Sequence, residues 1–86
     1  METSALTPLS RLRPGQKGHI AALESNDTRT IHKLMAMGIL PGMAVKVVQS
    51  TPSWVIQIGY TQVALDNRIA GAIRIRPTPE LPLDAG

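Results

Sequence analysis

The stretch Lys33–Val48, KLMAMGILPGMAVKVV, passes from one apolar periodicity to another within a few residues. Its first part belongs to a segment with apolar residues at helical spacing that ends at Gly38, whereas its last part alternates in the manner of a strand. Between the two parts lies the pair Pro41-Gly42. The stretch therefore predicts a helix, a tight turn and a strand in immediate succession.

The helix is predicted to begin after residues 26–28, Asn-Asp-Thr, whose side chains can accept hydrogen bonds from the first free amides. At its other end, a left-handed Gly38 just past the helix would make Leu34 and Ile39 the pair that touches in a Schellman ending. Leu40-Pro41-Gly42-Met43 is then predicted to form a type II turn, with Gly42 at positive φ. The expected inward face of the helix consists of Ile31, Leu34 and Met35.

Five short strands are predicted from period-two alternation and from the turn residues that bound them. They lie in KGHIAAL (17–23), MAVKVV (43–48), WVIQIG (54–59), GYTQVALD (59–66) and AIRIR (72–76). Asp66 is expected to cap a short turn over residues 67–70 that brings Ile69 to the core. Because five short twisted strands cannot bury two flat faces, we expect a mainly β fold: a small five-stranded barrel with the helix inserted between its first two strands.

The 86 residues are enough for one small domain, which is predicted over residues 9–76. Residues 1–8 are expected to form a flexible N-terminal segment. Residues 77–86 are expected to form a flexible proline-rich tail that contains a PxxP pattern. The N-terminal sequence lacks the features of an export signal and no apolar run is long enough to cross a bilayer, so direct membrane insertion is not expected and a cytoplasmic location is.

The predicted domain is basic, since it holds nine Lys and Arg residues and three acidic ones, for a formal charge of +6. Such a charge suits nucleic acid or an anionic membrane surface, and it is equally typical of a solvated surface. Small basic barrels bind single-stranded nucleic acid through several stacking aromatics. This chain has one Trp, one Tyr and no Phe, and Trp54 is predicted to be core, so nucleic-acid binding is kept as the alternative function rather than the expected one.

No motif for catalysis is present. The glycines do not form a phosphate-binding loop, the serines do not form a nucleophile elbow, and with no cysteine the chain has neither disulfides nor a thiolate site. We therefore expect a protein that is not an enzyme and requires no cofactor. His19 and His32 lack a metal-binding spacing, but a zinc or iron ion bound adventitiously or between two chains is left open. The residues available for such a site are His19, Glu24, Asp27 and His32.

Three segments together carry a family resemblance: LSRLRPGQKGHIAAL, HKLMAMGILPGMAVKVV and WVIQIGYTQVALDNRIAGAIRI. Over residues 9–75 they resemble the FeoA family, small cytosolic proteins associated with bacterial ferrous-iron uptake. The resemblance implies an SH3-like barrel and an accessory or regulatory role. It also implies binding to the cytosolic, GTP-binding part of the membrane transporter FeoB, which would recruit the protein to the inner face of the membrane. Whether two copies form a homodimer is left open.

Two groups of residues are candidates for the partner contact. Met37 and Leu40 have no assigned inward role and flank the Pro41-Gly42 turn, so they form an apolar patch unless they fold back onto the barrel. Arg74 and Arg76 point outward from the last predicted strand and offer charge for steering toward an acidic surface. The structural motif beside the patch consists of Leu34, Gly38, Ile39 and Gly42.

Overall fold

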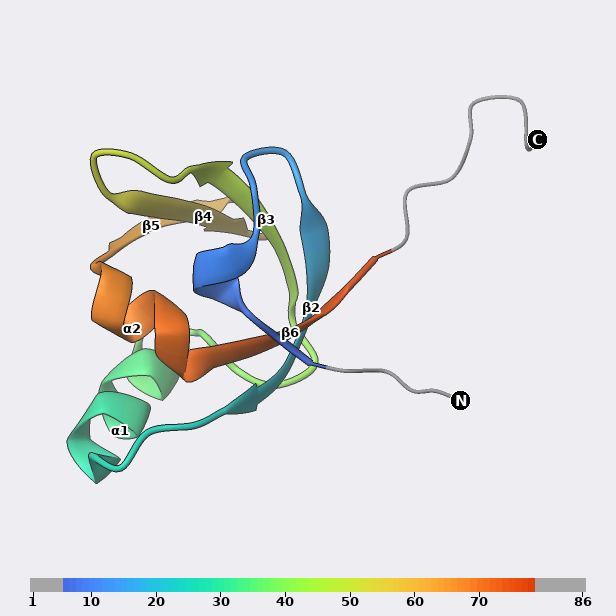
Figure 1. Ribbon diagram of the computed structural model, residues 1–86. Coiled ribbons are helices and arrows are strands. Elements are labelled where there is room, and N and C mark those ends of the chain that lie inside the picture. Colours follow the sequence, from blue (N-terminus) through green and yellow to red (C-terminus); the bar gives the residue numbers. More distant parts are fainter. Residues whose placement is uncertain (1–5, 79–86) are drawn as a thin grey trace.

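The structure is a computed structural model that describes residues 6–78 (Figure 1). In chain order the elements are β1 (Thr7–Pro8), the 3-10 helix η1 (Leu9–Arg11), β2 (Lys17–Leu23), α1 (Thr28–Ala36), β3 (Ala44–Gln49), β4 (Trp54–Ile58), β5 (Thr61–Leu65), α2 (Asn67–Ala72) and β6 (Ile73–Pro77). Of the two segments expected to be flexible, residues 1–5 and 79–86 lie outside the described residues. Thr7, Pro8 and Pro77, which were also assigned to those segments, belong to strands.

The strands form one antiparallel sheet in the order β1-β6-β2-β3-β4-β5. All five predicted strands are present, with α1 between the first two of them. The sixth strand, β1, corrects the predicted count. It pairs Thr7 with Ile75 and Pro8 with Arg74. Two residues carry no periodicity, so this strand exists only through its pairing with β6 and has no signature of its own in the sequence.

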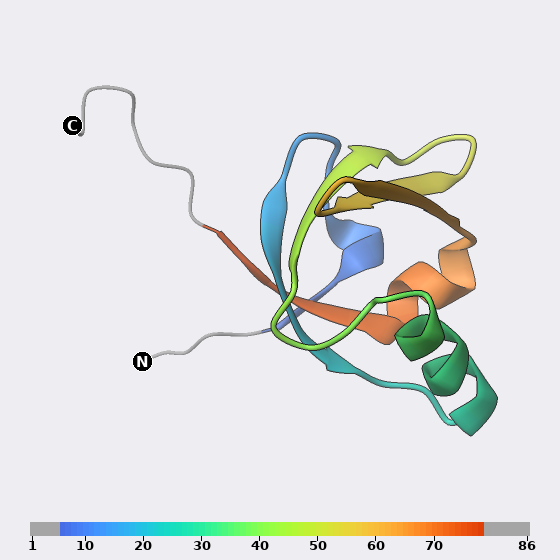
Figure 2. The same cartoon turned by 180° about the vertical axis from the view of Figure 1, so that it is seen from behind.

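The sheet curls around a single core, as Figures 1 and 2 show from opposite sides. Its curl is helped by two irregularities in register, one between Ile20 and Ala22 of β2 and the other between Val47 and Gln49 of β3. A bulge bends its strand and increases the local twist, which lets short strands wrap a small interior. The fully buried large side chains are Leu9, Ile20, Leu34, Ile39, Val47, Ile56, Ile73 and Ile75.

One close approach between strands depends on Gly18 of β2, which pairs with Pro77 of β6. A Cβ placed on Gly18 would lie 2.6 Å from Cγ2 of Ile75 and 2.7 Å from the carbonyl oxygen of Arg76. Both distances are shorter than van der Waals contact, so β2 and β6 can lie this close only with glycine at this position.

Helices α1 and α2 lie side by side at one end of the curled sheet (Figure 2). Each begins at an aspartate cap: Asp27 accepts a hydrogen bond from the amide of Arg29 at 3.0 Å, and Asp66 from that of Ile69 at 2.8 Å. These caps satisfy amides that have no partner within the helix. The turn predicted over residues 67–70 is thus the first part of a six-residue helix. Over residues 6–78 no helix has the length and apolar character needed to cross a bilayer.

Candidate functional site

The end of α1 has the hydrogen bonds of a Schellman motif, as the sequence predicted. Gly38 has φ +86°, its amide donates to the carbonyl of Met35 at 3.0 Å, and the amide of Ile39 donates to the carbonyl of Leu34 at 3.0 Å. Leu34 and Ile39 are both fully buried. The motif therefore fixes the direction in which the chain leaves the helix.

The following turn is held at two places. The amide of Met43 donates to the carbonyl of Leu40 at 3.1 Å and Gly42 has φ +93°, which confirms the predicted type II turn. The amide of Gly42 also donates to the carbonyl of Ile20 at 2.7 Å, and the amide of Ile20 donates to the carbonyl of Met43 at 2.9 Å. The turn is thus fastened to β2, so side chains on it are presented from a fixed backbone.

Four large apolar side chains in this region reach solvent. Met37 and Leu40, the two candidates from the sequence, are 38% and 37% exposed, and Pro41, which follows Leu40, is also exposed. Met35 is 46% exposed, so its predicted inward orientation is wrong; of the other two predicted inward residues, Leu34 is buried and Ile31 half-buried. Met43 is 38% exposed as well. We call Met35, Met37, Leu40 and Met43 the methionine surface.

Sequence reasoning missed half of this surface. Met35 lies next to Leu34 at a spacing that fits the inward face, and Met43 lies in register with the buried Val45 and Val47. A different signal was available, because three of the four methionines in the chain fall within nine residues. Methionine is flexible and polarizable, and it is over-represented on surfaces that bind other proteins.

The two arginines proposed for steering differ in their surroundings. Nε of Arg74 donates to Oε1 of Glu24 at 3.0 Å, and this ion pair is part-exposed. Arg76 of β6 is exposed, and the residue directly opposite it on β2 is His19. Of the two arginines, only Arg76 therefore has a charge that is not paired with a carboxylate among residues 6–78.

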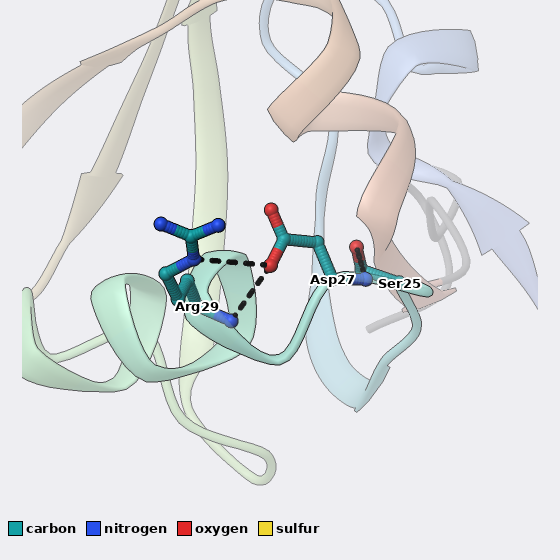
Figure 3. A network of polar contacts seen from close by, with 3 residues as sticks. All are labelled: Ser25, Asp27 and Arg29. Atoms are coloured by element: carbon teal, nitrogen blue, oxygen red, sulfur yellow. Dashed lines mark hydrogen bonds and ion pairs between the residues drawn. The ribbon is translucent and has the colours of Figure 1, made fainter.

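The four metal candidates are not brought together. Glu24 pairs with Arg74, whereas Asp27 caps α1, with its amide bonded to Oγ of Ser25 and its Oδ1 3.9 Å from Nε of Arg29 (Figure 3). His19 lies within β2, and His32 is exposed on α1. Among residues 6–78 no three His, Asp or Glu side chains gather closely enough to hold a metal ion.

A polar hollow of about 430 Å³ separates the starts of α1 and α2. Its carboxylates belong to Asp27 and Asp66, and both are engaged as helix caps. Its cations, Arg29, Lys33 and Arg68, are exposed. The hollow holds no histidine and no uncommitted carboxylate, so it offers no pair of groups for acid and base chemistry.

Trp54 does not provide a stacking platform for bases. It is 7% exposed, and its Nε1 donates to Oδ1 of Asn67 at 3.0 Å, which joins β4 to the start of α2. This confirms its predicted place in the core. Tyr60 is fully exposed at the tip between β4 and β5 and is the one aromatic side chain that reaches solvent in the described part of the chain.

Comparison with known proteins gives consistent matches. Residues 7–77 match the model of the FeoA domain. A curated relative from Leptolyngbya boryana, an Fe(2+) transport protein A, is 32% identical over 69 residues, which is 79% of this chain and 84% of the relative. The crystal structure of an iron uptake regulatory protein, FeoA, has a TM-score of 0.78 at 28% identity and covers 86% of this chain and 99% of its own.

A further solved structure bears on the fold. The zinc complex of Stenotrophomonas maltophilia FeoA, described as a procaryotic SH3 domain protein, has a TM-score of 0.69 at 20% identity over 78% of this chain and 86% of that one. At this identity the likeness concerns the fold alone, and it confirms the SH3-like architecture. The family match over residues 7–77 and the curated relative at 32% identity show that the chain belongs to the FeoA family of ferrous-iron transport accessory proteins.

Proposed function

We propose that this protein is a non-enzymatic accessory protein of ferrous-iron uptake that binds the cytosolic part of the FeoB transporter and modulates its activity or assembly. Membership of the FeoA family supports a role in ferrous-iron transport. In this proposal the protein works in the cytoplasm and reaches the inner face of the membrane through its partner. The role is one of protein contact, so it requires no cofactor.

The observation that carries the proposal is the methionine surface. Its side chains lie on a helix end closed by a buried Leu34–Ile39 contact and on a turn bonded to β2. A rigid backbone lowers the entropy lost on binding, while the flexible methionine side chains can adapt to the partner. Arg76 adds an exposed charge on β6 that can steer association with an acidic partner.

Modulation follows from differential affinity. If the methionine surface binds one conformation of the transporter more tightly than another, it shifts the population toward that conformation by the difference in binding free energy. A ligand that binds both conformations equally leaves their populations unchanged, so the contact must bind one conformation more tightly than the other.

The test is a matched pair of charge substitutions, Leu40→Glu on the methionine surface and Val48→Glu on β3. The two side chains are almost equally exposed, at 37% and 38%, so both variants are expected to stay folded. Binding is measured to membranes that contain FeoB and to membranes that lack it. We expect Leu40→Glu to weaken the FeoB-dependent binding by about tenfold or more, as for a central interface residue, and to impair growth on limiting ferrous iron.

Val48→Glu is expected to bind and to support growth like the unaltered protein. Folding of each variant is checked by circular dichroism and thermal denaturation. Equal binding and growth for a folded Leu40→Glu would exclude the methionine surface as the contact. Binding that does not depend on FeoB would overturn the proposed partner.

A further inference from the structure

The outer side of the sheet carries a cluster of basic side chains across three neighbouring strands. Lys17 of β2 lies directly opposite Lys46 of β3, and His19 of β2 lies directly opposite Arg76 of β6. All four residues are exposed, and they alternate along their strands with buried ones. We call Lys17, His19, Lys46 and Arg76 the basic face.

No described carboxylate neutralises this face. Residues 6–78 contain three acidic residues. Glu24, which directly follows the last residue of β2, pairs with Arg74, and Asp27 and Asp66 are helix caps. Within the same residues neither lysine of the basic face nor Arg76 takes part in an ion pair. Like charges directly opposite each other in an antiparallel pair are destabilising, so the Lys17–Lys46 arrangement does not serve the stability of the sheet.

The shape of the basic face indicates what it can bind. It borders a shallow hollow of about 260 Å³ lined by Lys17, His19, Lys46 and Gln57. Gly59 lines the same hollow, and the fully exposed Tyr60 follows it at the tip of the hairpin, where Ile58 pairs with Thr61. The face therefore combines spread positive charge with an aromatic side chain at its margin.

We propose that the basic face and Tyr60 dock the protein on the surface of an anionic phospholipid membrane. Two of its cations are lysines, which act as point charges and need no fixed geometry from their partner, whereas selective binding of a protein carboxylate favours the planar fork of arginine. Tyrosine is enriched at the level of the lipid headgroups, where its ring is partly buried and its hydroxyl stays hydrated.

Nucleic acid is disfavoured as the occupant. Single-strand binding combines a basic groove with several stacked aromatic side chains, and the described surface offers Tyr60 alone. A lipid surface requires only the charge and the interfacial ring.

The expected attraction is weak. Each lysine or arginine near an anionic membrane raises affinity on the order of fivefold, so Lys17, Lys46 and Arg76 together give on the order of a hundredfold. This suffices to orient the protein at a membrane and calls for a second contact to hold it there. The inference does not rest on the proposed function, because the lipid interaction requires no transporter.

The experiment uses the full chain and vesicles of phosphatidylglycerol and phosphatidylcholine in equal parts, with pure phosphatidylcholine vesicles as the neutral control. Co-sedimentation at low salt is expected with the anionic vesicles only and is expected to fall as salt is raised. The double variant Lys17→Gln with Lys46→Gln is expected to lose affinity about twentyfold or more. Tyr60→Ser is expected to lose affinity with less change in salt dependence.

The matched control is Arg29→Gln with Lys33→Gln on α1, which removes the same charge from exposed residues outside the basic face. It is expected to bind anionic vesicles nearly as well as the unaltered protein, and the thermal midpoint of each variant shows that it is folded. Equal loss in both double variants, or equal binding to neutral and anionic vesicles, would overturn the proposal. Tighter binding at the same salt to a single-stranded oligonucleotide or to polyglutamate would also overturn it. None of these results would bear on FeoB-dependent binding, which is measured as the difference in binding between membranes that contain FeoB and membranes that lack it.

Discussion

Leu34 and Ile39 are both fully buried on the two sides of Gly38, and the amide of Ile39 donates to the carbonyl of Leu34 at 3.0 Å. Gly38 has φ +86°, and no atom lies within 4 Å of a Cβ placed there. The need for glycine therefore comes from the backbone conformation and not from lack of space. This one residue closes the helix and directs the chain toward the turn that carries the methionine surface.

Replacement of Gly38 by valine is expected to destabilise the fold by about 1–2 kcal/mol or more, because a β-branched residue is strained at positive φ. Gly38→Asn is expected to cost less, since asparagine adopts the left-handed conformation more readily than other residues with a side chain. The measurement is urea denaturation of both variants. Equal stability of Gly38→Val and the unaltered protein would contradict the Schellman assignment.

Leu34 and Met35 are neighbours on α1 with opposite environments, at 0% and 46% exposure. Leu34→Ala is expected to lower the free energy of unfolding by about 2–5 kcal/mol through loss of core packing. Met35→Ala is expected to change it by less than about 0.5 kcal/mol, as is usual for surface sites. Chemical denaturation of the pair checks the prediction, and a large loss in Met35→Ala would place that side chain in the core.

Gly18 and Gly71 provide a second matched pair. Gly18→Ala is expected to destabilise the protein by about 1–3 kcal/mol, because its Cβ would overlap Ile75 and the backbone of Arg76 and push β2 away from β6. Gly71 lies inside α2, and a Cβ there would meet only Oγ of Ser10 at 3.8 Å, so Gly71→Ala is expected to stabilise by up to about 1 kcal/mol. An unchanged or raised thermal midpoint in Gly18→Ala would refute this account of Gly18, and a lowered midpoint in Gly71→Ala would refute that of Gly71.

Sequence reasoning succeeded where the interaction is local. The Schellman ending spans residues 34–39, the type II turn spans residues 40–43, and Asp66 caps an amide three residues away. Each of these features depends on the chemistry of a few consecutive residues, such as the positive φ that only glycine adopts without strain. The alternation of the strands succeeded for a related reason, since each inward position must be apolar to be buried.

The sequence by itself thus determined the helix, its two ends, five strands and, through its family resemblance, the SH3-like fold. Only the tertiary structure decided the rest: the exposure of Met35, Met37, Leu40 and Met43, the pairing of β1 with β6, the contact of Glu24 with Arg74 across 50 residues, and the lysine opposite Lys17. These features depend on which distant segments lie side by side and on how far the sheet curls. Neither is fixed by the order of residues within any one segment, because strand register and curvature arise from the packing of all strands around one core.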